Sequence, residues 1–149
     1  MRLATRLLLL PARLMPAALF ALATLIAVPA VAHDPAANHV VMQVSDADPA
    51  KWTLALNNAR NLQSDLGTRN VEIEIVAYGP GIGMLKADSV VGNRIGEALG
   101  AGVKVIACEN TMRGQKLEKP DMLNGIGYVP AGVVEIMRRQ QEHWAYLRP

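Results

Sequence analysis

The residue with the clearest chemical potential in this chain is Cys108, the only cysteine among its 149 residues. It follows the apolar segment 103–107, which is expected to form a strand, and precedes a polar segment that is expected to begin a short helix. The thiolate is the reactive form of cysteine, and helix N–H groups or a nearby cation favour it. A free cysteine is also one of the most frequently buried residue types. Cys108 is therefore either a reactive thiol or a small structural side chain.

A single cysteine rules out a disulfide within the chain and a cysteine-based metal cluster held by one chain. The three histidines, His33, His39 and His143, show neither helical i, i+4 spacing nor a carboxylate pair in a metal-binding pattern. We therefore predict no metal site and no cofactor.

The first 32 residues have the layout of a secretory signal peptide. Arg2, Arg6 and Arg13 precede the apolar run 14–28, and Ala30-Val31-Ala32 provides a cleavage site with small residues. We expect cleavage after Ala32 and one domain, residues 33–149, that is periplasmic or secreted. An N-terminal anchor that is kept is the alternative, although the run is short for a membrane span.

The basic character of the full chain comes from this N-terminal segment. Three of the 15 Lys and Arg residues lie before residue 33, which leaves 12 against the 13 Asp and Glu residues. A nearly neutral domain gives no basis for binding nucleic acid. We likewise expect no membrane association after cleavage, because no later segment is long and apolar enough to span a bilayer.

Apolar runs and helical patterns alternate along the rest of the chain. Strands are expected at 39–45, 71–78, 103–107 and 128–130, and helices at 49–66, 89–99, 111–117 and 133–146. Asp48 and Pro49 are suited to begin the first helix, and Gly67 to end it. The alternation predicts an α/β fold of three layers, α/β/α, around a parallel sheet of about four to five strands.

Ligands of open parallel sheets bind at the carboxyl ends of the strands. Three segments reach that edge with chemistry-bearing residues: Ser45 and Asp46 after the first strand, the glycine-rich segment 79–83 after the second, and the segment 108–113 after the third. The glycines do not fit a phosphate-binding motif, because they are not G-x-G-x-x-G and no Lys-Ser or Lys-Thr follows. We assign Cys108 as the candidate catalytic residue, and the candidate binding residues around it are Gly79, Gly81, Asn110, Thr111 and Arg113.

Three segments together resemble the DsrE/DsrF-like family, which has the YchN-like fold. They are Tyr78-Gly-Pro-Gly-Ile-Gly-Met-Leu85, Val105-Ile-Ala-Cys-Glu-Asn-Thr-Met-Arg113 and Val129-Pro-Ala-Gly-Val-Val-Glu-Ile136. The resemblance implies a parallel α/β fold and a homo-oligomer, a trimer or a hexamer. It also implies that the cysteine at the position of Cys108 holds sulfane sulfur as a persulfide in a sulfur relay. The family's well-understood members are cytoplasmic, whereas this chain has an export signal.

Two functions follow as hypotheses. The first is a periplasmic sulfur-handling protein in which Cys108 carries or transfers sulfane sulfur, with a sulfur donor or acceptor protein, or a small thiol, as its partner. The second is a non-catalytic oligomeric module that binds a small ligand and in which the cysteine is structural.

Overall fold

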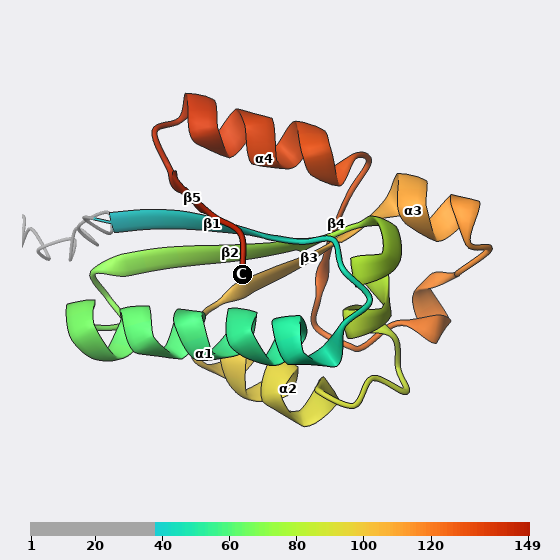
Figure 1. Ribbon diagram of the computed structural model, residues 1–149, viewed down its shortest axis with the longest axis horizontal. Helices are drawn as coiled ribbons and strands as arrows, with labels where there is room; N and C mark the ends of the chain where they lie inside the picture. Colours follow the sequence, from blue (N-terminus) through green and yellow to red (C-terminus); the bar gives the residue numbers. More distant parts are fainter. Residues whose placement is uncertain (1–37) are drawn as a thin grey trace, which may run out of the picture. The chain divides into compact units, whose positions relative to one another are not determined.

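Five parallel strands form one sheet in the order β4-β3-β2-β1-β5 (Figure 1). The structure is a computed structural model that describes residues 38–149, and the expected signal peptide, 1–32, lies outside the described residues. The strands are β1 (Asn38–Val44), β2 (Val71–Ala77), β3 (Lys104–Cys108), β4 (Gly127–Val129) and β5 (Ala145–Leu147). The helices are α1 (Pro49–Leu66), η1 (Gly79–Leu85), α2 (Gly92–Gly100), α3 (Glu109–Gly114), η2 (Lys119–Asp121) and α4 (Gly132–Gln141). The predicted fold class is confirmed.

The first helix begins and ends where the sequence predicts. The Asp48 carboxylate accepts a hydrogen bond from the Ala50 N–H at 2.9 Å, and Pro49 occupies the first helical position. An N-cap of this kind stabilises a helix by about 1 kcal/mol. The helix ends at Gly67, whose φ of 87° lies in the region that favours glycine.

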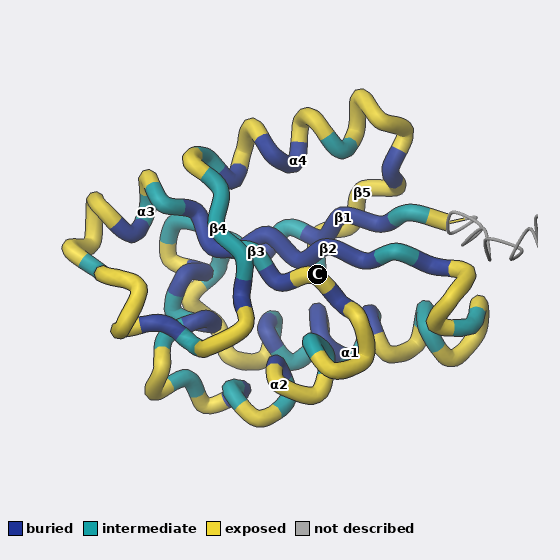
Figure 2. Tube along the Cα trace, turned by 180° about the vertical axis from the view of Figure 1, so that it is seen from behind, coloured by how far each residue is buried: buried dark blue, intermediate teal, exposed yellow. Residues whose placement is uncertain are grey.

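The two faces of the sheet are covered unequally. Helices α1 and α2 pack on one face over a large core that includes Met42, Ile73 and Val105. Helix α4 lies on the other face (Figure 1), over a cluster of four buried side chains: Val41, Val76, Ile136 and Trp144. The central strands are accordingly buried along most of their length (Figure 2). None of the helices within residues 38–149 is long and apolar enough to cross a membrane.

The sequence predicts a turn for the glycine-rich segment after β2, but the structure is more regular. This segment is a 3₁₀ helix, η1, that continues to Leu85. A Cβ on Gly81 would collide with the backbone carbonyl of Val44 at the end of β1. Glycine at this position therefore lets η1 lie directly against the carboxyl end of β1.

The C-terminal region corrects the sequence prediction most clearly. The helix expected over 133–146 ends at Gln141, and His143 takes a positive φ of 65° that reverses the chain. This reversal buries Trp144 against the sheet, and β5 then pairs in parallel with β1, with Val40 opposite Ala145. Burial of Trp144 and backbone pairing with β1 therefore outweigh the helical pattern of the sequence in this segment.

Candidate functional site

Cys108 is the last residue of β3 and also the N-cap of α3. It lies at the carboxyl edge of the sheet, where Figure 1 shows α3 beyond the strand ends, and Val129 of β4 is its neighbour in the ladder. Its side chain is only 5% exposed. The sequence prediction placed this helix at 111–117, but it begins at Glu109, directly after the cysteine.

The surroundings of the Cys108 sulfur favour its charged form. Burial raises the pKa of the thiol, but hydrogen bonding by the Thr111 hydroxyl and by the backbone N–H groups of Gly132, Thr111 and Asn110 outweighs burial, so the pKa lies below that of an ordinary cysteine. The Asn110 N–H also donates to the carbonyl of Pro130 at 3.1 Å, so Asn110 is the weakest of the three backbone donors. The N-termini of α3 and α4 both lie beside Cys108: α3 begins at the next residue, and a Cβ on Gly132 of α4 would lie 3.3 Å from the Cys108 Cβ.

Thr111 connects the cysteine to η1. Its hydroxyl oxygen accepts a hydrogen bond from the Gly79 N–H at 2.9 Å, which leaves the hydroxyl hydrogen for the Cys108 sulfur. Gln115 also donates to the Gly79 carbonyl, at 3.3 Å. The backbone of the glycine-rich segment therefore orients the Thr111 hydroxyl and does not contact the sulfur itself.

Gly132 is a site residue that the sequence prediction did not include. A Cβ at this position would lie 3.2 Å from the Tyr78 Cβ and from Val76 Cγ1, and 3.3 Å from the Cys108 Cβ. Only glycine brings the first turn of α4 this close to the thiol without displacing a neighbour. The available sequence signal was the Val-Pro-Ala-Gly segment that contributes to the family resemblance.

The remaining predicted site residues lie around the thiol in different roles. Asn110 and Arg113 are exposed, and the Arg113 guanidinium donates to the Asn110 side-chain oxygen. Arg113 is not among the groups that lower the pKa of Cys108. Gly81 lies against the end of β1, and the Gly79 N–H donates to the Thr111 hydroxyl.

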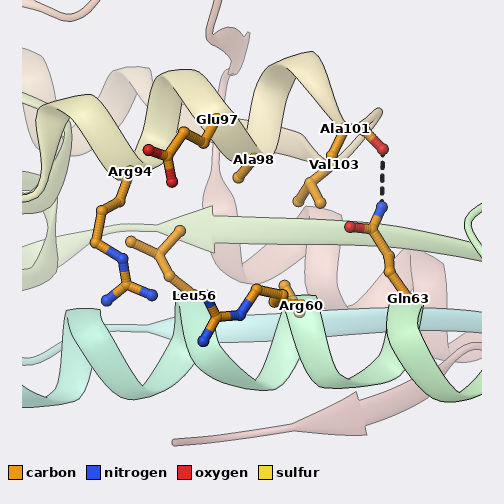
Figure 3. A pocket seen from close by; sticks show the side chains of 9 residues that line it. Leu56, Arg60, Gln63, Arg94, Glu97, Ala98, Ala101 and Val103 are labelled. Carbon is orange, nitrogen blue, oxygen red and sulfur yellow. Dashed lines mark hydrogen bonds between the residues drawn. The ribbon is translucent and has the colours of Figure 1, made fainter.

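Several surface hollows lie on the part of the chain that the structure describes, and Cys108 lines none of the three that follow. One, of about 360 Å³, lies next to the site and is lined by Gln43, Tyr78, Val133, Ile136, Met137, Gln140 and Tyr146. A second, of about 300 Å³, lies beside α3. The third, of about 170 Å³, separates α1 from α2 on the other face of the sheet (Figure 3), where Gln63 donates to the Ala101 carbonyl at 2.8 Å. Within residues 38–149, no three His, Cys, Asp or Glu side chains gather as metal ligands would.

A family model described as the DsrE/DsrF-like family matches residues 38–149. The chain belongs to the DsrE/DsrF-like family. At the level of this family, membership indicates a sulfur-relay type of function. None of the curated protein sequences is significantly similar to this chain.

Solved structures agree with membership in the DsrE/DsrF-like family. A protein of unknown function from Methanobacterium thermoautotrophicum, MTH1491, is 40% identical with a TM-score of 0.72, over 75% of this chain and 99% of that one. The YchN protein from E. coli is 12% identical with a TM-score of 0.58, over 75% and 99% of the two chains. A Bacteroides thetaiotaomicron protein of unknown function, BT1422, is 15% identical with a TM-score of 0.58, over 75% and 95%. The last two establish the fold alone.

Proposed function

We propose that this protein is an exported sulfur carrier in which Cys108 holds sulfane sulfur as a persulfide. The observation that carries the proposal is the position of Cys108, where α3 begins and where Gly132 brings the first turn of α4 against it. Hydrogen bonding by the Thr111 hydroxyl and by backbone N–H groups of both helices holds the thiol pKa below its usual value. The thiolate is the nucleophile in sulfur exchange, so a lowered pKa makes more of it available at neutral pH.

The chemistry is an exchange between sulfur atoms that needs no external oxidant. The Cys108 thiolate attacks the terminal sulfane sulfur of a polysulfide, which forms Cys–S–S⁻ and releases a polysulfide dianion one sulfur shorter. With thiosulfate as the donor, the leaving group is sulfite. A partner thiolate then attacks the outer sulfur, takes it as its own persulfide and regenerates the Cys108 thiolate. The described domain has no second cysteine that would close a disulfide with Cys108.

The proposal places this exchange in the periplasm or outside the cell, after cleavage behind Ala32. A mass measurement of the protein purified from an exporting host tests the export step. Loss of residues 1–32 supports it, and an intact N-terminus with membrane-bound protein supports the alternative of an anchor.

We also propose that the carrier is a homo-oligomer, with a trimer or hexamer as the states that the family resemblance implies. Helix α4 and strand β5 expose large apolar side chains, of which Val133, Met137 and Tyr146 line one hollow on the α4 side of the sheet. Contiguous exposed apolar surface is typical of protein interfaces. Native mass spectrometry measures the oligomeric state directly.

The second candidate function is a non-catalytic binding module, and the burial of Cys108 favours it, because a side chain 5% exposed reacts slowly with bulky reagents. Alkylation of the folded protein at neutral pH separates the two. Reaction without denaturant supports the carrier, and reaction only after unfolding supports the module. Cys108→Ser abolishes sulfur loading in a carrier, whereas in a module its main effect is a stability loss of about 1–3 kcal/mol from burying the hydroxyl.

A further inference from the structure

Three charged side chains, Glu74, Glu135 and Arg139, form a cluster between α4 and the sheet. Glu74 of β2 is 1% exposed, and the Arg139 guanidinium donates to both of its carboxylate oxygens, at 2.7 and 3.3 Å. Arg139 also lies 3.0 Å from the carboxylate of Glu135, which is 4% exposed. The Arg139 guanidinium stacks over the Trp144 ring at 4.5 Å.

The rest of the local charge is peripheral to this cluster. Arg138 donates to Glu135 at 2.9 Å, and Glu142 accepts from Arg139 at 3.1 Å. Lys104 on β3 adds a more distant positive charge near Glu74. The ring of His39 also lies near Trp144, with the two ring centroids 5.1 Å apart.

Burying these charged side chains costs desolvation free energy. Burial raises the pKa of Glu74 above its usual value even though Arg139 acts in the opposite direction, so the carboxylate is held charged at a cost. Well-packed apolar side chains of similar size often stabilise a fold as well as a buried ion pair does. The cluster therefore calls for an explanation other than stability.

The apolar contacts under α4 are few, and they fix its orientation less sharply than directed polar contacts do. The buried cluster beneath it consists of Val41, Val76, Ile136 and Trp144, with the partly buried Tyr78 and Ile106 packed against it. Apolar burial has no preferred direction, whereas a two-point hydrogen bond between a guanidinium and a carboxylate fixes both distance and orientation. Arg139 lies on the same side of α4 as Gly132, about two turns further along. A helix fixed at Arg139 is consequently fixed at Gly132.

We propose that the Glu74–Arg139–Glu135 cluster positions α4 so that its first turn, at Gly132, stays against Cys108. Glu74, Arg139 and Glu135 are positioning residues, because none of them contacts the sulfur. The inference rests on the proposed function, because a stabilised thiolate is useful only if Cys108 is reactive and not merely structural.

The test is the thiol pKa of Cys108, measured from the pH dependence of alkylation of the folded protein by iodoacetamide. The double variant Glu74→Met/Arg139→Met replaces the ion pair by apolar side chains and leaves Glu135 with Arg138. We expect the pKa to rise by about one unit, which lowers the alkylation rate about tenfold at a pH below both pKa values. Glu72→Gln is the matched control, because Glu72 lies on the same strand but pairs with Lys104, and it leaves the pKa unchanged.

A double variant that unfolds cooperatively and keeps the wild-type thiol pKa would overturn the proposal. Glu74→Gln keeps the shape of the side chain and removes its charge. We expect this single variant to raise the pKa of the Cys108 thiol by a smaller amount. It provides the test if the double variant does not fold. Sulfur loading of the wild type is scored separately. Loading without a pKa shift in the variants contradicts the positioning role alone, and a pKa shift without loading contradicts the sulfur carrier alone.

Discussion

Replacing Thr111 by valine tests how the thiol of Cys108 is tuned. Valine keeps the shape of threonine and removes the hydroxyl that donates to the sulfur and accepts from the Gly79 N–H. A hydrogen bond to a charged group contributes about 1.5–3 kcal/mol, and 1.36 kcal/mol corresponds to one pKa unit. Because Thr111 is partly exposed, the lower end of that range applies. We therefore expect the pKa of Cys108 to rise by about one unit.

The assay is the rate of alkylation by iodoacetamide across pH, measured on folded protein. Thr111→Ser is the matched control, since serine keeps the hydroxyl and loses only the methyl group, and its thiol pKa stays close to that of the wild type. A Thr111→Val protein whose thiol pKa equals that of the wild type would refute the assignment of Thr111 as a donor to the sulfur. A rise in both variants would point to altered packing of α3 instead.

Three further predictions follow from the same geometry. Gly132→Ala places a Cβ 3.2–3.3 Å from Tyr78, Val76 and Cys108. We therefore expect the free energy of unfolding, measured with urea, to fall by about 1–3 kcal/mol and the thiol pKa to rise. Wild-type values of both would contradict the close approach of α4. The lowered pKa of Cys108 stabilises the fold at pH values above the pKa of an unfolded cysteine, and this contribution is lost as the pH falls through the folded pKa. The stability difference between the wild type and Cys108→Ala, measured by urea unfolding across pH, therefore grows in favour of the wild type as the pH rises, and a constant difference would contradict the lowered pKa. Met137→Lys puts a charge on the exposed apolar surface of α4 and is expected to reduce the number of subunits in the oligomer measured by native mass spectrometry. An unchanged oligomer would show that the interface does not include this surface.

The features that the sequence predicted depend on local signals. Asp48, Pro49 and Gly67 determine where α1 begins and ends, and each acts within a few residues of its own position. The position of Cys108 at a strand end and helix start follows in the same way from an apolar run and the polar segment after it.

The features that the sequence did not predict depend on contacts between distant segments. Strand β5 is three exposed residues, and it forms because β1 offers an unpaired edge. Gly132 approaches the thiol only because α4 crosses back over the sheet after β4. Glu74 alternates with apolar residues as a solvent-facing side chain would, yet it is buried by Arg139, which lies 65 positions later in the chain.

The central claim is that Cys108 carries sulfane sulfur, and the most direct measurement is the mass of the intact protein after incubation with polysulfide. The account predicts a mass increase of one sulfur atom, mapped to Cys108 by peptide analysis, removed by a small thiol and absent from Cys108→Ser. A wild-type protein that gains no sulfur, although its Cys108 is alkylated in the folded state, would contradict the account.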